Sequence, residues 1–221
     1  GRMSYGIYNA GSGKININKA TVSSKSNYIC AFGIFNKNDG IINVIDGKIE
    51  SNISFTGSMS ISKQYTIYNE IGTINIEGGI IDATTSSAED VYAIFNASTG
   101  EVTISGGNIL SLQYGLYNNG KGTMHISGGS IEASSSKYSK VKIAMYIKDA
   151  NSKVIIEGGE FKGKTSSIDI PDGMMIKSSS EYETGYVNLL KGKHLAYKIE
   201  EGVVVNYLAD GATVELQKPN G

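Results

Sequence analysis

Two acidic residues have the spacing most suggestive of chemistry in this sequence. Glu50 and Asp82 occupy equivalent positions in consecutive copies of a repeat, so stacked strands would hold their backbones about 4.8 Å apart. Carboxyl groups about 5 Å apart suit a retaining glycosidase, or they can share a Ca²⁺ ion. The equivalent residues of the other copies are Ser23, Leu110, Glu132 and Lys162. That set builds no pocket, so we interpret both carboxylates as surface charge and expect no metal site.

Other catalytic arrangements are poorly represented. A polysaccharide lyase would need acidic metal ligands and a Lys or Arg over a groove, yet the only arginine is Arg2 and lysines do not cluster with acids in any column. The two histidines, His125 and His194, lie far apart in the sequence, and no P-loop, nucleophile elbow, HExxH or EF-hand motif occurs. We expect no catalytic residue and no cofactor. A fragment of a polysaccharide lyase or glycoside hydrolase is the remaining catalytic alternative.

The composition excludes several classes of partner. Among 221 residues the net charge is −1, and the 20 basic residues are dispersed, so no nucleic-acid footprint is present. No apolar run approaches the roughly 20 residues of a membrane span, so we expect no membrane insertion. The single cysteine, Cys30, excludes an intramolecular disulfide and is interpreted as a small buried hydrophobic residue. The 28 glycines and 2 prolines indicate many tight turns between strands.

An internal repeat supplies the elements that would position these side chains. "YGIYN" begins at Tyr5, and related phrases begin at Phe32, Tyr65, Tyr92 and Tyr114. Each copy continues into a strand such as "GTINI", then a "GG" pair and a third strand such as "GGIIDA". The second "GG" position and its equivalents are Ala20, Gly47, Gly79, Gly107, Gly129 and Gly159. Three short strands per copy, with no helical pattern, predict stacked strands.

Three columns of the aligned copies are uniformly apolar and are predicted to line the interior. They are Ile15, Ile42, Ile74, Val102, Met124 and Val154; Ile17, Val44, Ile76, Ile104, Ile126 and Ile156; and Val22, Ile49, Ile81, Ile109, Ile131 and Phe161. One copy cannot bury its apolar face alone, so neighbouring copies must stack to form a continuous core. Between the first two columns lies a mostly polar one that should face solvent: Asn16, Asn43, Asn75, Thr103, His125 and Ile155.

The repeat resembles the right-handed parallel β-helix of pectate-lyase-like folds. More narrowly, it resembles the "YGIYN…GTITISGG" arrays of bacterial cell-surface proteins, through "IYN", "IFN" and "ISGG", as at Ile104–Gly107 and Ile126–Gly129. The resemblance covers about Tyr5 to Gly163, and it implies an extracellular location at the bacterial surface or in secreted form. We therefore expect an all-β fold with a right-handed parallel β-helix (β-solenoid) of about six regular three-strand coils over residues 1–163. Irregular coils or a β-structured cap, with Met174 and Met175 in its core, are expected over residues 164–221.

The chain starts within a coil and has no N-terminal cap, which favours a segment of a longer protein. Asparagines end the first strand of five copies, and stacking should place them in a structural ladder at a bend. They are Asn9, Asn36, Asn69, Asn96 and Asn118.

Two aromatic columns stand three residues apart in the first strand, so we expect them on opposite faces. The first, Tyr5, Phe32, Tyr65, Tyr92 and Tyr114, is placed inside with the isoleucines that begin at Ile7. The second, Tyr8, Phe35, Tyr68, Phe95, Tyr117 and Tyr146, is placed outside beside the small residues Gly6, Gly33, Thr66, Ala93, Gly115 and Ala144. The outer rings could bind a ligand by stacking on sugar rings, or they could simply stack on one another.

Three hypotheses about function follow. The first is a non-catalytic spacer or adhesin that contacts host or matrix ligands, partly through the loops Asn52–Gln64 and Thr84–Val91; it predicts no deep acidic groove and no perturbed carboxylates. The second is a carbohydrate-binding module, which predicts that Tyr8, Tyr68 and Tyr117 are coplanar and exposed. The third is an enzyme, which predicts that Glu50 and Asp82 face one cleft with a basic neighbour.

Overall fold

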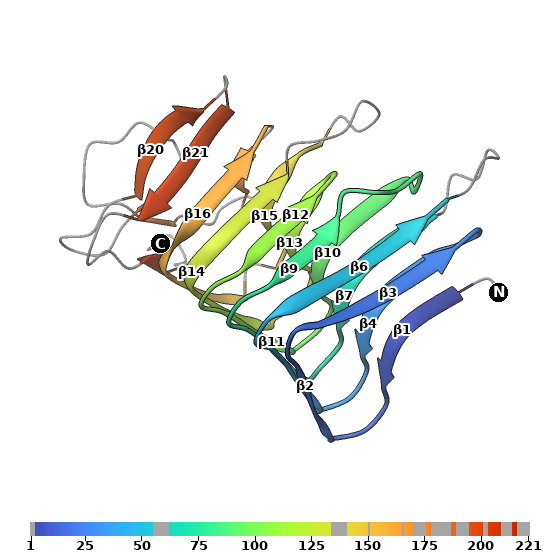
Figure 1. Ribbon diagram of the computed structural model, residues 1–221. Helices are drawn as coiled ribbons and strands as arrows, with labels where there is room; N and C mark the ends of the chain where they lie inside the picture. Colours follow the sequence, from blue (N-terminus) through green and yellow to red (C-terminus); the bar gives the residue numbers. More distant parts are fainter. Residues whose placement is uncertain are drawn as a thin grey trace.

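The computed structural model describes residues 3–54, 62–133, 141–149, 151–164 and 166–169, together with the short strands at 176–177, 187–188, 195–200, 203–208 and 214–215. Within this part the chain forms β-strands and no helix, so the all-β prediction is confirmed (Figure 1). Accordingly, no helix in the described residues is long and apolar enough to cross a membrane. Met174, Met175, His194 and most of the region 164–221 lie outside the described residues.

One sheet collects the first strand of every copy. Its order is β1 (Met3–Asn9), β4 (Cys30–Asn36), β7 (Lys63–Asn69), β10 (Asp90–Asn96), β13 (Tyr114–Asn118), β15 (Ile143–Ile147) and β17 (Ser166–Asp169). All pairs in this sheet are parallel, and each joins strands one copy apart.

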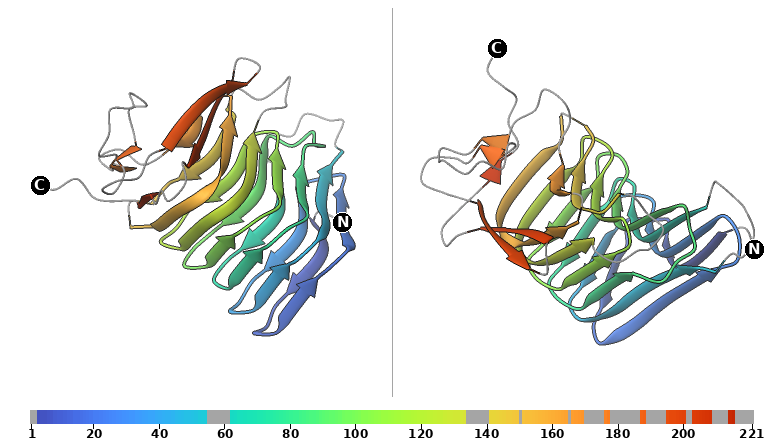
Figure 2. Two further views of the ribbon diagram at one scale, coloured as in Figure 1. Left: turned by 60° about the vertical axis from the view of Figure 1, so that its left-hand side comes forward. Right: turned by 90° about the horizontal axis from the view of Figure 1, so that it is seen from above.

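The second and third strands of the copies form a larger sheet that folds back on itself. Its path is β2 (Lys14–Ile17), β5 (Ile41–Val44), β8 (Thr73–Ile76), β11 (Glu101–Ile104), β14 (Thr123–Ala133), β12 (Asn108–Ser111), β9 (Ile80–Ala83), β6 (Gly47–Ile53) and β3 (Ala20–Ser26). The return is made through β14, a long strand that pairs with β11 in one half and with β12 in the other. Figure 2 shows the strands side by side along the molecule, with β1 at one end.

Antiparallel pairing appears only at the far end of the described strands. β16 (Lys153–Gly163) pairs in parallel with β14 and antiparallel with β21 (Val203–Leu208) and β22 (Val214–Glu215). β20 (Leu195–Glu200) is antiparallel to β21, and a separate short pair joins β18 (Ile176–Lys177) to β19 (Val187–Asn188). The change from parallel to antiparallel pairing covers the edge of β16, which would otherwise be open.

The predicted apolar columns form the core. Register pairs join Ile15 to Ile42, Ile42 to Ile74 and so on along the stack. From the second copy onward all three columns are buried in one continuous cluster. Ile15 and Val22 are only partly buried, because β2 and β3 have a neighbour on one side only. The prediction that these columns line the interior is therefore confirmed, and their burial is less complete at the end of the stack, where one neighbouring strand is missing.

The "GG" pair has a conformational reason. Its second residue, at Gly47, Gly79, Gly107, Gly129 and Gly159, has φ between +79° and +116°. Residues with a Cβ rarely adopt these φ values, whereas glycine adopts them without steric cost. In the first copy, where Lys19 and Ala20 replace the pair, the positive φ of 55° falls on Lys19 instead.

Candidate functional site

The two aromatic columns lie on the same side of the seven-stranded sheet, which corrects the prediction of opposite faces. Phe32, Tyr65 and Tyr92 are buried in a cluster of their own, separate from the main core that contains Ile34. The rings packed against that cluster include Phe35 and the other residues of the second column up to Tyr117. The first column is therefore buried by other rings and not by the isoleucines.

A break in the pleat explains this arrangement. The ladder between β1 and β4 pairs Tyr5 with Phe32 and then Ile7 with Ile34, with no pair at the glycines between them. A Cβ on Gly33 would lie 3.0 Å from Cγ2 of Ile49 in the core. Gly33 and Ile34 thus both face inward, so the alternation slips by one residue and the flanking rings emerge on one side. The small residues sit inside, where the walls approach closely, and not outside as predicted.

The rings of the second column stack face to face. Successive rings from Tyr8 to Tyr146 have centroids 4.6 to 5.4 Å apart and interplanar angles of 13° to 27°. The first column stacks in the same way, and rings of the two columns meet edge to face, as between Phe32 and Phe35 at 5.0 Å and 73°. Each such pair contributes about 0.5–1.5 kcal/mol beyond the burial of area.

This stacking bears directly on sugar binding by the second column. A ring that stacks on a sugar offers it a free face, but the faces of Phe35, Tyr68, Phe95 and Tyr117 are covered by their neighbours. The expectation that Tyr8, Tyr68 and Tyr117 are coplanar is wrong, because these rings are stacked along the ladder. Tyr8 is 47% exposed, and the other five rings are half-buried. A ligand-binding role of these six residues stays a prediction, with mutual stacking the better account of their geometry.

The ladder also changes the acidity of its tyrosines. Burial raises the pKa of Tyr117 to about 12, with smaller contributions from Tyr146, Tyr114 and Asp90. Burial likewise raises the pKa of Tyr65, Tyr92, Tyr68 and Tyr114 above the ordinary value. These phenols therefore stay protonated at neutral pH and offer no general base.

The predicted asparagine positions form a chain of amide hydrogen bonds at the bend after the first strand. The Nδ2 of each of the first four asparagines donates to the Oδ1 of the next. The distances are 2.9 Å for Asn9 to Asn36, 3.0 Å for Asn36 to Asn69, 3.0 Å for Asn69 to Asn96 and 2.9 Å for Asn96 to Asn118. The same Nδ2 groups donate to glycine carbonyls in the turn, as from Asn69 to Gly72 at 2.7 Å. The last four asparagines are fully buried, so the ladder supplies partners to turn carbonyls that water does not reach.

A shorter ladder runs over the outer face of the second strands. Nδ2 of Asn43 donates to Oδ1 of Asn16 at 2.7 Å, and Nδ2 of Asn75 donates to Oδ1 of Asn43 at 2.8 Å. Asn16 is exposed and Asn75 half-buried, but Asn43 is only 8% exposed, so the expectation of a solvent-facing column holds in part. His125 in the same column is half-buried.

Glu50 and Asp82 do share a site, and the shared partner is a lysine. Nζ of Lys48 lies 2.7 Å from Oε2 of Glu50 and 3.0 Å from Oδ2 of Asp82. Thr84 holds Asp82 further, donating to Oδ1 from its backbone N–H at 2.9 Å and from its hydroxyl at 2.6 Å. The statement that lysines do not cluster with acids is therefore wrong. Lys48 lies two residues before Glu50 on the same face of β6, a spacing that could have revealed it.

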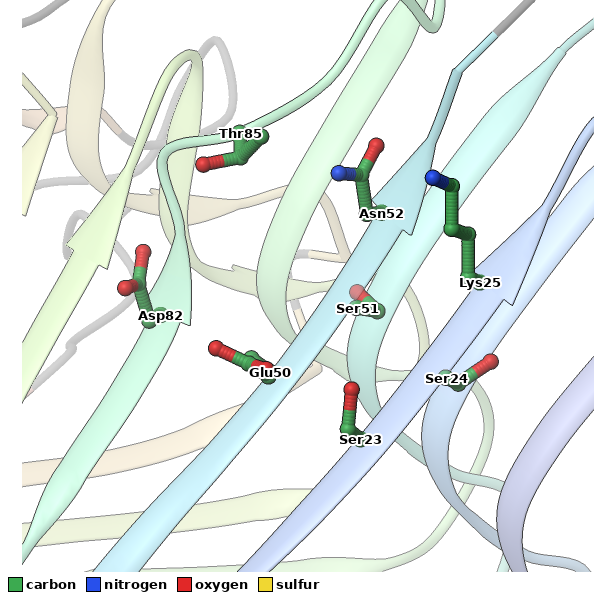
Figure 3. A pocket seen from close by; sticks show the side chains of 8 residues that line it. All are labelled: Ser23, Ser24, Lys25, Glu50, Ser51, Asn52, Asp82 and Thr85. Atoms are coloured by element: carbon green, nitrogen blue, oxygen red, sulfur yellow. The ribbon is translucent and has the colours of Figure 1, made fainter.

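These carboxylates border a hollow of about 190 Å³ on the outer face of β3, β6 and β9. Its walls are Ser23, Ser24, Lys25, Glu50, Ser51, Asn52, Asp82 and Thr85. Figure 3 shows Glu50 and Asp82 at one side and Lys25 at the other, with Thr85 in the segment after β9. Ser24 and Ser51 are buried, and their hydroxyls bond to Ser4 and Thr66 of the seven-stranded sheet. The inference that this column builds no pocket is therefore also wrong.

The electrostatics of the hollow do not suit glycoside hydrolysis. Hydrogen bonding from Lys48 lowers the pKa of Glu50, outweighing burial, and Ser23 adds to the effect. Burial opposes ionisation of Asp82, but hydrogen bonds from Thr84 and Lys48 prevail and lower its pKa. Both groups are ionised at neutral pH, whereas the glycosidase mechanism needs one carboxyl kept protonated as a general acid. The carboxylates are thus perturbed, against the expectation for a non-catalytic module, but by ion pairing.

Comparisons with protein-family models, with curated proteins and with solved structures find no match to this chain. The site must therefore be judged from its own geometry. Among the described residues, no group of three or more His, Cys, Asp or Glu side chains is placed to hold a metal ion.

Two further features of this surface bear on ligands. Tyr28 follows β3, is 50% exposed and has no ring partner among the described residues. The sequence analysis did not single it out, because it belongs to no repeat column. Of the two loops expected to make contacts, Thr84–Val91 is described, while residues 55–61 of Asn52–Gln64 lie outside the described part.

Proposed function

We propose that the chain is a right-handed parallel β-helix of about six three-strand coils that serves as a non-catalytic module of a bacterial surface protein. In this role it is a stiff spacer that holds adhesive contacts for host or matrix ligands away from the cell. The extracellular location rests on the resemblance of the repeat to bacterial surface arrays.

One observation carries the proposal: equivalent residues pair along the whole stack without a shift of register in the first strands. Asn9 pairs with Asn36, Asn36 with Asn69, Asn69 with Asn96, and Asn96 with Asn118. The buried amide ladder and the double aromatic ladder follow the same direction, so each copy is fixed to the next by hydrogen bonds and ring contacts at once. Such nearest-neighbour interfaces make a repeat array stiff along its axis.

The adhesive part of the proposal is tested by binding the purified chain to an array of glycans and extracellular-matrix proteins. We expect saturable binding to at least one of them. The catalytic alternative is tested in parallel by incubating the chain with a panel of polysaccharides. Turnover that is abolished by Glu50→Gln would contradict the non-catalytic role.

A further inference from the structure

The hollow over β3, β6 and β9 continues into a second one at the end of β3. This second hollow, of about 390 Å³, is lined by Ser4, Lys25, Ser26, Asn27 and Tyr28. Lys25 lines both hollows, so they adjoin at this side chain, and we call the two together the Tyr28–Asp82 groove. Apart from Ser4 of β1, its lining comes from the larger sheet and the residues that follow β3 and β9, and it includes no residue of the aromatic columns.

Register makes the floor of the groove a regular grid of polar groups. Ser23, Glu50 and Asp82 are direct neighbours across the three strands, and Lys25 and Asn52 form a second row two residues further along. Neighbouring groups are therefore about 4.8 Å apart across the strands and about 6.6 Å apart along them. This spacing is close to the dimensions of one pyranose ring.

The groups of the grid are held in place before any ligand arrives. Lys48 and Thr84 fix both oxygens of Asp82, and Lys48 fixes one oxygen of Glu50. A site whose polar groups are already oriented loses less entropy when it binds.

The chemistry of the walls indicates the class of ligand. The hydroxyls of the exposed Ser23 and Thr85 and the Asn52 amide can donate and accept, carboxylates accept and Lys25 donates, which is the mixture that sugar hydroxyls require. Among the described residues, no aliphatic side chain lines either hollow, and the polar groups there favour a polar ligand over an apolar peptide or helix. Glu50 and Asp82 are balanced in charge by Lys48 and Lys25, so the groove has no net charge to offset the cost of removing water from an acidic or basic sugar.

Tyr28 supplies the group that the polar grid lacks. Its backbone N–H donates to Oγ of Ser26 at 3.2 Å, which fixes the turn that presents the ring. The ring is 50% exposed and contacts no other ring among the described residues, so it can pack on the C–H face of a sugar.

We propose that the Tyr28–Asp82 groove binds a neutral oligosaccharide, with one sugar over the Glu50–Asp82 grid and the next against Tyr28. The proposal rests on the adhesive function proposed above, and it gives that function a ligand class and a place.

The test measures the affinity of the chain for cellotriose, mannotriose, galactotriose and the N-acetylglucosamine trimer by calorimetric titration, with trigalacturonate as the charged comparator. We expect saturable binding of at least one neutral trisaccharide and weaker binding of trigalacturonate. Tyr28→Ala should weaken the neutral ligand by about tenfold or more. Tyr8→Ala is the matched control, since Tyr8 is similarly exposed but belongs to the aromatic ladder, and it should leave affinity unchanged.

The polar grid is tested with Asp82→Asn, which should also weaken binding, against Glu101→Gln on the other half of the sheet, which should not. If Asp82→Asn fails to fold, Asn52→Ala replaces it. Lack of binding by every neutral trisaccharide, preference for trigalacturonate, or sensitivity to Tyr8→Ala in place of Tyr28→Ala would overturn the proposal. A stack shown to be rigid by spin-label distances, but without glycan binding, overturns this inference alone. A stack that is not rigid overturns the proposed spacer.

Discussion

Two asparagine ladders run along this molecule with the same amide-to-amide contact and different surroundings. The inner ladder, from Asn9 to Asn118, is almost wholly buried and also donates to glycine carbonyls of the turn. The outer ladder, from Asn16 to Asn75, lies on the outer face of the second strands, where exposure varies from residue to residue.

The difference shows what makes a repeated residue structural. The inner column contains asparagine in five successive copies and ends in the buried Ile147, which is an apolar substitute. The outer column changes to Thr103, His125 and Ile155 after three copies. A buried turn carbonyl without a partner costs far more than one that water can reach, so the requirement for an amide applies only to the inner column.

The largest effect is expected at the centre of the inner ladder. Asn69→Ala removes the donor to Gly72 and the acceptor for Asn36, and leaves both partners buried. The free energy of unfolding should fall by about 3 kcal/mol, since each buried polar group left unpaired costs about 1–3 kcal/mol. Urea denaturation followed by circular dichroism measures this change. A loss below about 1 kcal/mol would mean that the buried ladder is not structural.

A second effect is expected at high pH, where the buried tyrosines of the aromatic columns resist ionisation. Folded Tyr65, Tyr92 and Tyr117 have raised pKa values, while tyrosines in the unfolded chain ionise near pH 10. Their contribution to stability is complete below pH 10 and is lost as the pH rises through their folded-state pKa values. For Tyr117 that pKa is about 12. Since the unfolded tyrosines lose their protons over this range while the folded ones keep them, stability should fall by about 1 kcal/mol for each of these tyrosines between pH 10 and 11.

Denaturation at several pH values checks this dependence. The double variant Tyr65→Phe and Tyr92→Phe keeps both rings and removes only their hydroxyl groups, so its stability should fall less steeply above pH 10. Equal slopes for the variant and the original chain would show that the buried phenols do not control alkaline stability.

The smallest effect is expected in the outer ladder. Asn75→Ala removes one amide contact at a half-buried position, where water can replace the lost partner. The free energy of unfolding should change by no more than about 0.5 kcal/mol, in the range of surface substitutions. Measured beside Asn69→Ala under the same conditions, this variant is the matched control. A loss as large as that of Asn69→Ala would remove the distinction between the ladders.

The sequence predicts much of this architecture because one residue type recurs at one position. The apolar columns and the pairing of Asn9 with Asn36 follow from alignment of the copies alone. The direction of the aromatic columns does not, because the alternation rule assumes an unbroken pleat. Each first-strand ladder skips the residue after the first ring, and at Gly33 this residue faces Ile49 in the core, a break that no pattern of period two reveals.

The candidate site was only half predictable, for a different reason. The Glu50–Asp82 pair follows from the alignment, and Lys48 could have been placed on their face by its spacing. Tyr28 could not, since it lies in a segment whose length differs between copies and aligns with nothing. Features fixed by the repeat are visible in a repeated sequence, whereas a binding groove on its variable surface appears only when the strands are brought together.

A distance between the two ends of the stack tests most directly whether the copies form one rigid array in register. Lys14 and Lys153 are both exposed and belong to one register column through Ile41, Thr73, Glu101 and Thr123. Spin labels on Lys14→Cys and Lys153→Cys, in a chain that also carries Cys30→Ser, would be separated by five strand spacings. Double electron–electron resonance should give one narrow distribution near the backbone separation of roughly 24 Å, broadened only by the label linkers. A broad or multiple distribution, or a mean distance far longer than this, would contradict the account.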